Sequence, residues 1–290
     1  MRAFAYERPA HLDEAVALLA DHGPEARLLA GGTDLIIRIR DGSIRPRTVV
    51  DVKGIAEIDG EIRDLDGHLT IGARAVMTAI AADERIRRDH QALAEAALVV
   101  GAVQIRNRAT LAGNICNASP AADTVPALLV YGAQVVVVGP GGIRRIAIDD
   151  LLVRSGVTTL APGELVTAIE LPLPPTPRGS VHVRRTRRRG HDLASVTLAC
   201  AVDADGTTRI AYGSLGPRPL LVVDETGVLA DPESSDAARE ARLADLFIDA
   251  APSPRSMRAS PEYRLAMLRV LALRALGMAR ERLGTRGAPA

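Results

Sequence analysis

Apolar residues recur at helical spacing early in the chain and form short runs between polar segments further on. The segment 12–20 (LDEAVALLA) favours a helix, and the Ala-rich segment 78–99 favours one or two more. Short apolar runs that favour strands lie at 27–29, 48–52 and 69–72. The first part of the chain is therefore predicted to mix short strands with short helices.

The pattern changes after the second helical segment. Residues 104–119 (QIRNRATLAGNICNAS) have no clean period and many small polar side chains, so we expect an ordered loop there. Asp123, followed by a threonine and an early proline, is typical of a helix start. Apolar runs at 134–138 and 144–148 flank the turn residues GPGG and predict a β-hairpin.

A proline-rich segment at 172–177 (PLPPTP) marks the place where we expect a domain boundary. Beyond it, alternating apolar and polar residues predict antiparallel strands at 180–187, 194–202 and 207–214. A long final helix is expected over 261–283. The chain is therefore divided into a first domain of 1–175 and a second of 176–290.

Charge and hydropathy exclude several classes of protein. The formal net charge is +1, so no global field attracts nucleic acid or an anionic membrane. No apolar run approaches the roughly 20 residues that a membrane span needs. Acidic residues occur too early for a signal peptide. A cytoplasmic protein without a membrane span is therefore expected.

Cysteine and histidine are too sparse for a metal centre in this chain. Cys116 and Cys200 are the only cysteines, whereas an iron–sulfur cluster or a structural zinc site needs more ligands. The six histidines show no metal-binding spacing. We therefore predict that this chain holds no metal and that any metal chemistry comes from another chain.

Two glycine-containing loops, AGGTDL at 30–35 and TLAGN at 110–114, carry the pattern most typical of a ligand site. Glycine lets the backbone approach a ligand closely, and consecutive amides can form a nest for an anion. Neither loop contains lysine, so the pair suits a pyrophosphate bound mainly by backbone amides. Asp123 adds a carboxylate suited to the hydroxyls of a sugar or ribityl chain. Neutral hydrogen-bond partners are supplied by Thr33, Thr110, Asn114, Asn117 and Ser119.

These loops alone do not distinguish a structural turn from a binding site. The chain has no GxGxxG, which argues against a Rossmann site, and no GxxxxGK(S/T), which excludes the usual P-loop. Longer strings indicate the family. LLAGGTDL at 28–35 and QIRNRATLAGNICNASPAADTVPALLVYGA at 104–133 resemble the medium, flavin-binding subunit of the xanthine dehydrogenase and carbon monoxide dehydrogenase (molybdenum hydroxylase) family. Further similar segments follow in the same order at 163–172, 184–196 and 258–264.

This resemblance implies a fold class and a domain arrangement. The class is α+β, with a FAD-binding fold of the molybdenum hydroxylase and vanillyl-alcohol oxidase type. That fold would consist of two subdomains, about 1–55 and 56–175. A C-terminal α+β domain, with an antiparallel sheet and helices, would occupy 176–290.

The resemblance also assigns residues around a FAD that lies between the two N-terminal subdomains. The first loop would contact the pyrophosphate and nearby flavin atoms through Leu28, Leu29, Ala30, Gly31, Gly32, Thr33, Asp34 and Leu35. The second would comprise Thr110, Leu111, Ala112, Gly113 and Asn114, with Ser119 close by. Asp123 would hold ribityl or ribose hydroxyls, Val100 and Val166 would give apolar contacts, and Arg184 would lie near the flavin. No residue is expected to be catalytic in its own right, since the flavin supplies the redox chemistry.

Two positions depart from the family pattern. Ala112 replaces the first glycine of the usual pair, which matters if that position needs a positive φ. We expect the change to be tolerated. Arg184 stands where many relatives have lysine; it keeps the charge but changes the geometry, with consequences for flavin potential or acceptor preference.

Other conspicuous residues have simpler interpretations. The basic cluster at 184–189 lacks aromatic stacking partners, so a strand edge, a subunit contact or a charge near the flavin is favoured over nucleic-acid binding. His182 and His191 are expected to be surface or hydrogen-bonding residues, and Cys116 a small packed one. Core or interface packing is favoured over flavin stacking for Tyr6, Tyr131, Tyr212 and Tyr263.

In the complexes that the chain resembles, a large subunit holds the molybdenum cofactor and a small subunit carries two 2Fe-2S clusters. The resemblance implies that this chain binds FAD, takes electrons from the clusters and passes them to an external acceptor, within a dimer of heterotrimers. Two alternatives stay open. One is a non-catalytic assembly subunit with a decayed flavin site, and the other is a single-chain FAD oxidoreductase.

Overall fold

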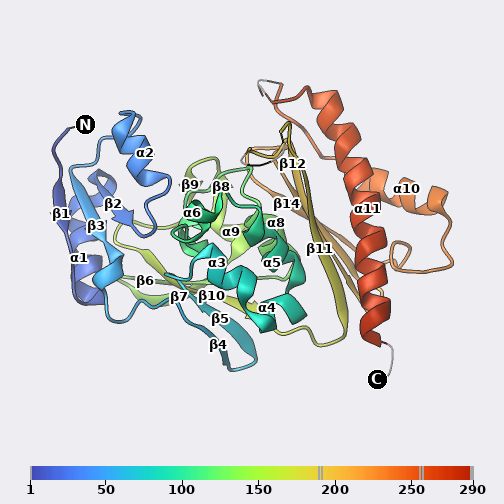
Figure 1. The fold of residues 1–290 in the computed structure, drawn as a ribbon, viewed down its shortest axis with the longest axis horizontal. Helices are drawn as coiled ribbons and strands as arrows, with labels where there is room; N and C mark the ends of the chain where they lie inside the picture. Colours follow the sequence, from blue (N-terminus) through green and yellow to red (C-terminus); the bar gives the residue numbers. More distant parts are fainter. Residues whose placement is uncertain (1, 189, 191, 255, 257, 288–290) are drawn as a thin grey trace.

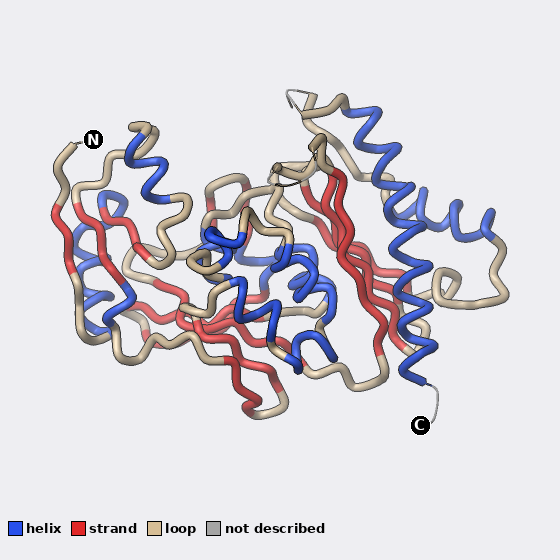
Figure 2. Tube along the Cα trace, in the orientation of Figure 1, coloured by secondary structure: helices blue, strands red, loops and turns tan. Residues whose placement is uncertain are grey.

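The computed structural model describes residues 2–287 except positions 189, 191, 255 and 257. Three regions follow one another along the longest axis of the molecule, in chain order (Figure 1). Their strands form three separate larger sheets, of three, five and four strands (Figure 2). The chain is an α+β protein, as the sequence predicted.

The N-terminal region is built on a parallel sheet with strand order β1-β3-β2. Its strands are β1 (Ala5–Glu7), β2 (Ala26–Leu29) and β3 (Thr48–Asp51), and the central strand β3 is buried throughout. Its helices are α1 (Leu12–His22), η1 (Gly23–Glu25), α2 (Leu35–Arg40) and η2 (Val52–Gly54). The predicted helix over 12–20 is confirmed as α1. The first glycine loop therefore connects the end of β2 to the start of α2.

The central region contains an antiparallel sheet with strand order β4-β5-β10-β6-β7. Its strands are β4 (Ile62–Leu65), β5 (His68–Gly72), β6 (Gln134–Gly139), β7 (Gly142–Ala147) and β10 (Leu165–Pro172). The smaller elements are α9 (Ile148–Leu151), β8 (Leu152–Arg154) and β9 (Val157–Thr158). The predicted hairpin is confirmed, with Val135 opposite Ile146 and Val138 opposite Ile143.

Six short helices belong to this central region. They are α3 (Met77–Ala82), α4 (Glu84–Asp89), α5 (Gln91–Leu98), α6 (Val103–Arg106), α7 (Leu111–Cys116) and α8 (Thr124–Val130). The segment 78–99 is helical as predicted but forms three helices. Asp83 accepts hydrogen bonds from the amides of Arg85 and Ile86 and caps α4, and the non-helical backbone of His90 separates α4 from α5.

The expectation of a loop over 104–119 was wrong. That stretch contains most of α6 and all of α7. Helices of four and six residues are too short to show a helical period, so their sequence could not reveal them. The one local signal was Thr110, whose side chain accepts a hydrogen bond from the amide of Gly113 and caps α7.

The C-terminal region is an antiparallel meander, β11-β12-β13-β14, as predicted for its first three strands. Its elements are β11 (Arg178–Arg185), β12 (Val196–Asp203), β13 (Thr208–Gly213), β14 (Leu220–Asp224), α10 (Asp236–Leu246) and α11 (Pro261–Gly287). α11 lies along one face of this sheet, and α5 and α8 pack against the other (Figure 1).

Small side chains bring α8 close to the C-terminal sheet. Ala199, Ala201 and Ala211 lie on the sheet face that joins the core of the central region, whereas the opposite face forms a second core with α11. All seven residues of α8 are buried as a result. The residue that precedes α8, Asp123, is thereby brought to the seam between the central and C-terminal regions.

Candidate functional site

Two carbonyl groups of the first glycine loop are in contact with cationic side chains. Arg108 Nε donates a hydrogen bond to the Gly31 carbonyl at 3.3 Å, and Lys53 Nζ lies 3.5 Å from the Ala30 carbonyl. The N–H and C=O of one peptide point in opposite directions, so fixing the Gly31 carbonyl also fixes the amide of Gly32. Among the described residues, the amides of Gly32 and Thr33 have no protein acceptor. They are therefore available to an anionic ligand.

Lys53 and Arg108 both contact the first glycine loop, and sequence reasoning identified neither. Lys53 is the only lysine in the chain, and its ammonium group lies 2.6 Å from Asp51, which is 2% exposed and also accepts from Tyr6. Burial acts to raise the pKa of Asp51, but the hydrogen bonds from Lys53 and Tyr6 outweigh it and keep this pKa below its usual value. Asp51 is thus an ionised anchor that keeps a cation beside the loop.

The first glycine loop touches the backbone that leads into the second. A Cβ atom on Gly31 would lie 2.0 Å from the carbonyl oxygen of Arg108, which shortly precedes the second loop. Gly32 has a φ of 75°, a left-handed conformation that favours glycine. Gly31 therefore lies against the backbone of Arg108, and only the absence of a side chain permits this contact.

The second loop forms the first turn of α7 rather than an irregular nest. Leu111 points into the core, and its amide donates to the Ala75 carbonyl, so this residue presents no donor to a ligand. The amide of Gly113 is bonded to Thr110 Oγ1 at 3.1 Å. Ala112 is the residue between them, and the described protein supplies no acceptor for its amide.

Ala112 stands where relatives have glycine, but it does not adopt a backbone conformation with positive φ. It lies within α7 and is not among the described residues with positive φ, which are glycines together with Asp66, Ala118 and Ser214. A methyl group is compatible with helical backbone, and this one is buried in the core. The departure from the family pattern therefore carries no left-handed strain.

Asp123 joins the loops to the C-terminal sheet. Its side chain is 9% exposed, and its Oδ2 accepts a hydrogen bond from Arg184 Nη1 at 2.8 Å. Its Oδ1 is buried without a hydrogen-bond partner in the described structure. Thr124, the next residue, donates to Asn114 at 2.7 Å and so ties α8 to α7. A buried acceptor without a partner is costly, which points to a hydroxyl or amine that completes it.

The remaining predicted residues lie in several elements of the N-terminal and central regions. Leu28 and Leu29 end β2, and Asp34 is exposed immediately before α2, which Leu35 begins. Val100 is half-buried after α5, and its carbonyl accepts from Arg106. Val166 is only 7% exposed within β10, and Ser119 accepts a hydrogen bond from the Ala121 amide.

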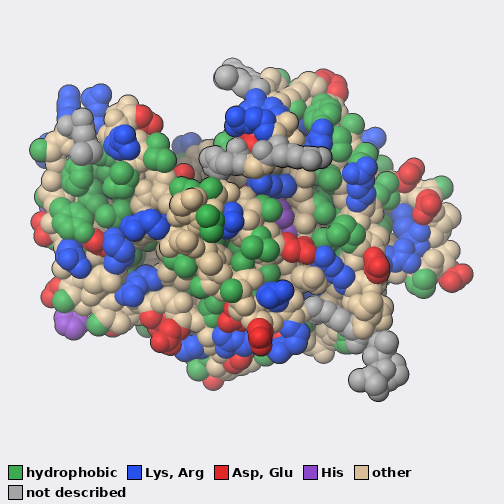
Figure 3. All heavy atoms as spheres, in the orientation of Figure 1, with side chains coloured by type: hydrophobic (Ala, Val, Ile, Leu, Met, Phe, Trp, Pro, Cys, Tyr) green, Lys and Arg blue, Asp and Glu red, His purple; other side chains and the backbone are tan. Residues whose placement is uncertain are grey.

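Most of the basic cluster is engaged by protein partners. Arg184 binds Asp123, Arg185 donates to the Tyr263 hydroxyl, and Arg187 and Arg188 lie within 3.7 Å of Asp192. Arg189 and His191 lie outside the described residues. Over the face seen in Figure 3, cationic and anionic side chains are interspersed.

The structure also shows the surroundings of His182, Cys116 and the four tyrosines. His182 is buried and hydrogen-bonded, so the surface alternative does not apply to it. Cys116 packs against the core, and burial raises the pKa of its thiol to about 12. Tyr131 and Tyr212 are core residues, whereas Tyr6 and Tyr263 are partly exposed and hydrogen-bonded.

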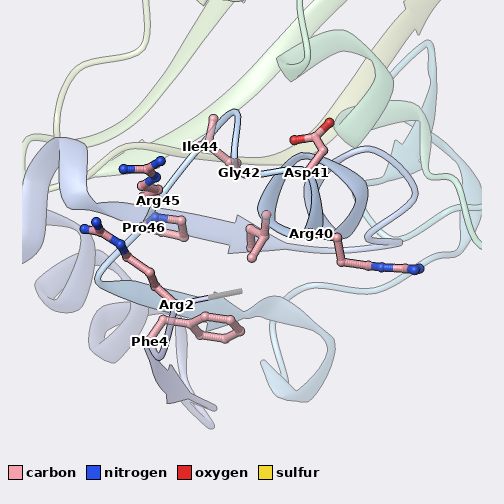
Figure 4. Close-up of a pocket in the computed structure, with 9 residues that line it drawn as sticks. Arg2, Phe4, Arg40, Asp41, Gly42, Ile44, Arg45 and Pro46 are labelled. Carbon is pink, nitrogen blue, oxygen red and sulfur yellow. The ribbon is translucent and has the colours of Figure 1, made fainter.

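A cavity of about 230 Å³ lies at the far end of α2 from the first glycine loop. It is lined by Arg2, Phe4, Ile39, Arg40, Asp41, Gly42, Ile44, Arg45 and Pro46. Arg2 and Arg45 extend to the same side of it in Figure 4, whereas Arg40 points away. None of the predicted site residues lines this cavity, so it is distinct from the paired loops.

The donor set of the paired loops is compatible with FAD. Free amides beside Gly31 and flanking cations suit a pyrophosphate, and the unpartnered oxygen of Asp123 suits a hydroxyl-bearing chain. Comparison with known proteins identifies the family. Residues 2–174 match the FAD binding domain in molybdopterin dehydrogenase. Residues 181–279 match the CO dehydrogenase flavoprotein C-terminal domain.

The chain belongs to the FAD-binding subunits of the molybdopterin dehydrogenases. A xanthine dehydrogenase FAD-binding subunit of Escherichia coli O157:H7 is 33% identical over 272 residues, which is 92% of each chain. A carbon monoxide dehydrogenase medium chain of Afipia carboxidovorans is 31% identical over 285 residues, covering 97% of this chain and 98% of the relative. Membership thus extends over both the N-terminal and C-terminal regions.

Solved structures of this family share the fold. A Cu,Mo-CO dehydrogenase structure matches 96% of this chain with a TM-score of 0.89 and 30% identity. Quinoline 2-oxidoreductase from Pseudomonas putida 86 matches 97% of it with a TM-score of 0.84 and 26% identity. The chain is thus an oxidoreductase flavoprotein subunit. Among its described residues, no helix combines the length and the apolar character that a membrane span requires.

Proposed function

We propose that this subunit binds one FAD without a covalent bond and relays electrons within its complex. It takes them from 2Fe-2S clusters of a small partner subunit and passes them to an external acceptor. The observation that carries the proposal is the contact of Gly31 with the backbone just before the second glycine loop, together with the unpartnered amides of the first loop and the unpartnered oxygen of Asp123.

The residues of the chain have binding and positioning roles in this proposal. Bound FAD supplies the redox chemistry, because a flavin exchanges electrons either singly or in pairs. The amides of Gly32 and Thr33 hold the pyrophosphate, with Lys53 and Arg108 fixing the loop behind them. Asp123 accepts from a ribityl or ribose hydroxyl through Oδ1, and Arg184 holds the carboxylate in place through Oδ2.

The partners are proposed from the family. A large subunit with the molybdenum cofactor oxidises the organic substrate, a small subunit carries the clusters, and two heterotrimers associate. The names of the relatives support membership of a larger assembly, since they describe a FAD-binding subunit and a medium chain. The single-chain oxidoreductase is disfavoured for this reason.

A decayed flavin site is the weaker interpretation on structural grounds. Its one support was Ala112, and that residue has ordinary helical backbone within α7. The contact at Gly31 and the cation beside the loop are both intact. An assembly role alone would give these features no purpose.

Acid precipitation of the purified complex tests the proposal. The flavin should be released into the supernatant and should be identified there as FAD, in a ratio of one per copy of this chain. The reason is that the amides, cations and Asp123 described above form only non-covalent contacts. Release of FMN, flavin that remains with the precipitate, or no flavin at all would contradict it.

Replacing Asp123 with alanine should weaken FAD binding by roughly 1–3 kcal/mol, because a charged hydrogen bond to a ligand hydroxyl is lost. This corresponds to a dissociation constant raised about 5- to 150-fold, measurable by flavin fluorescence. The matched control is Asp245→Ala, which removes an exposed carboxylate from α10. Equal affinities for both variants and the unaltered chain would remove Asp123 from the site.

A further inference from the structure

His182 is a buried titratable residue beside Asp123 that the proposed function does not use. It lies on β11, where Ser180, His182 and Arg184 share the face toward α5 and α8. Its side chain is 2% exposed. Its Nε2 is 2.9 Å from the Thr197 hydroxyl and 3.7 Å from Asp123 Oδ1, the oxygen without a hydrogen-bond partner.

We propose that His182 is a positioning residue of the FAD site whose proton state controls Asp123. A neutral imidazole bonds Thr197 and leaves Oδ1 of Asp123 to accept a hydroxyl of the ligand. A protonated imidazole attracts the same oxygen and withdraws it. The proposal rests on the proposed function, and it makes FAD affinity fall as the pH is lowered.

Several charged groups lie near His182, and among them Asp123 is the one whose position would change when His182 gains a proton. From α5, Glu95 Oε2 accepts the backbone amide of His182 at 2.9 Å, and its Oε1 already accepts from Arg282 of α11 at 2.6 Å. From its own strand, Arg184 engages Asp123 only through Oδ2. Thr197 of β12 has no charge. The oxygen that faces both His182 and the ligand is therefore Oδ1.

The sign of the effect follows from linkage. In this proposal FAD binds the form with neutral His182 more tightly, so adding a proton to His182 must weaken FAD binding. A single proton gives a slope of at most about tenfold per pH unit.

The test measures the FAD dissociation constant of the full-length chain by flavin fluorescence from about pH 5 to pH 8. The unaltered chain should bind more weakly toward acid, by up to about tenfold per pH unit. His182→Gln, which can still bond Thr197 but cannot titrate, should bind with a flat profile. His22→Gln, at the exposed end of α1, should keep the slope.

A second variant covers the case in which His182→Gln does not fold. Asp123→Asn keeps the shape of the carboxylate but removes the charge that attracts an imidazolium, so its profile should also be flat. A flat profile for the unaltered chain, or an unchanged slope in either variant, would overturn the role of His182. A chain that binds no FAD at any pH would instead contradict the proposed function.

Discussion

Gly31→Ala is expected to weaken FAD binding on the order of 100-fold or more. The added Cβ would lie 2.0 Å from the carbonyl oxygen of Arg108 and 2.7 Å from its carbonyl carbon. Both atoms belong to the backbone, so no side-chain rotation relieves the clash, and overpacking of this kind typically costs 1–3 kcal/mol or more. The two loops must separate, and the hydrogen bond from Arg108 to Gly31 is lost with the contact.

Flavin fluorescence titration of the apoprotein would measure this loss, and thermal unfolding would show whether the variant still folds. Gly141→Ala is the matched control, since a Cβ at that turn meets nothing within 4 Å. Gly113→Ala should have a smaller effect than Gly31→Ala, because its nearest neighbour is the Thr110 hydroxyl at 2.9 Å. Normal affinity in a folded Gly31→Ala protein would show that the loop contact is not needed for FAD.

Local signals in the sequence identified those elements whose residues interact mainly with near neighbours in the chain. The helix at 12–20, the hairpin of β6 and β7 and the C-terminal meander each combine a clear period with recognisable turn residues. The pairing of β10 with β5 and β6 was beyond such signals, because it joins segments far apart in the sequence. The helices α6 and α7 were missed because they are too short to show a period.

The residues of the candidate site likewise fall into those that the sequence identified and those that depend on tertiary contacts. Its glycines and Asp123 were identifiable from loop composition and from the family resemblance. Lys53 and Arg108 were not, since their contacts with the first loop depend on how β3 and α6 are placed beside it. The alternation at 180–187 predicted a strand, but it could not reveal that the polar face of this strand meets Asp123. Tertiary contacts also explain Ala112, whose helical backbone removes the need for glycine.

The C-terminal region therefore contributes to the site as well as to the stability of the chain. Arg184 and His182 both approach Asp123 from β11, while small residues of β12 and β13 allow α8 to pack closely enough for that contact. Arg282 of α11 secures the arrangement through Glu95 and the Ser180 carbonyl. A shift in the position of α11 would therefore be transmitted through Glu95 and His182 to Asp123, the carboxylate proposed to hold FAD.

The flavin of the isolated subunit is expected to stay oxidised when an organic substrate is added under anaerobic conditions. In the proposed complex, substrate is oxidised at the molybdenum cofactor of the large subunit, and clusters on the small subunit connect that centre to this chain. The chain itself has two cysteines, Cys116 and Cys200, which cannot make a four-cysteine cluster. Cys200 is buried and Cys116 packs against the core, and burial raises the pKa of each thiol to about 12.

Loss of the visible flavin absorbance band is the measurement, made with the isolated subunit and with the reconstituted complex. A purine, an aldehyde, an N-heterocycle and carbon monoxide cover the substrate classes, and dithionite serves as the control that should bleach both samples. A substrate that bleaches the complex should have no effect on the isolated subunit, because binding FAD is separate from oxidising substrate in this division of roles. Bleaching of the subunit alone would place substrate oxidation on this chain and would favour the single-chain oxidoreductase over the relay.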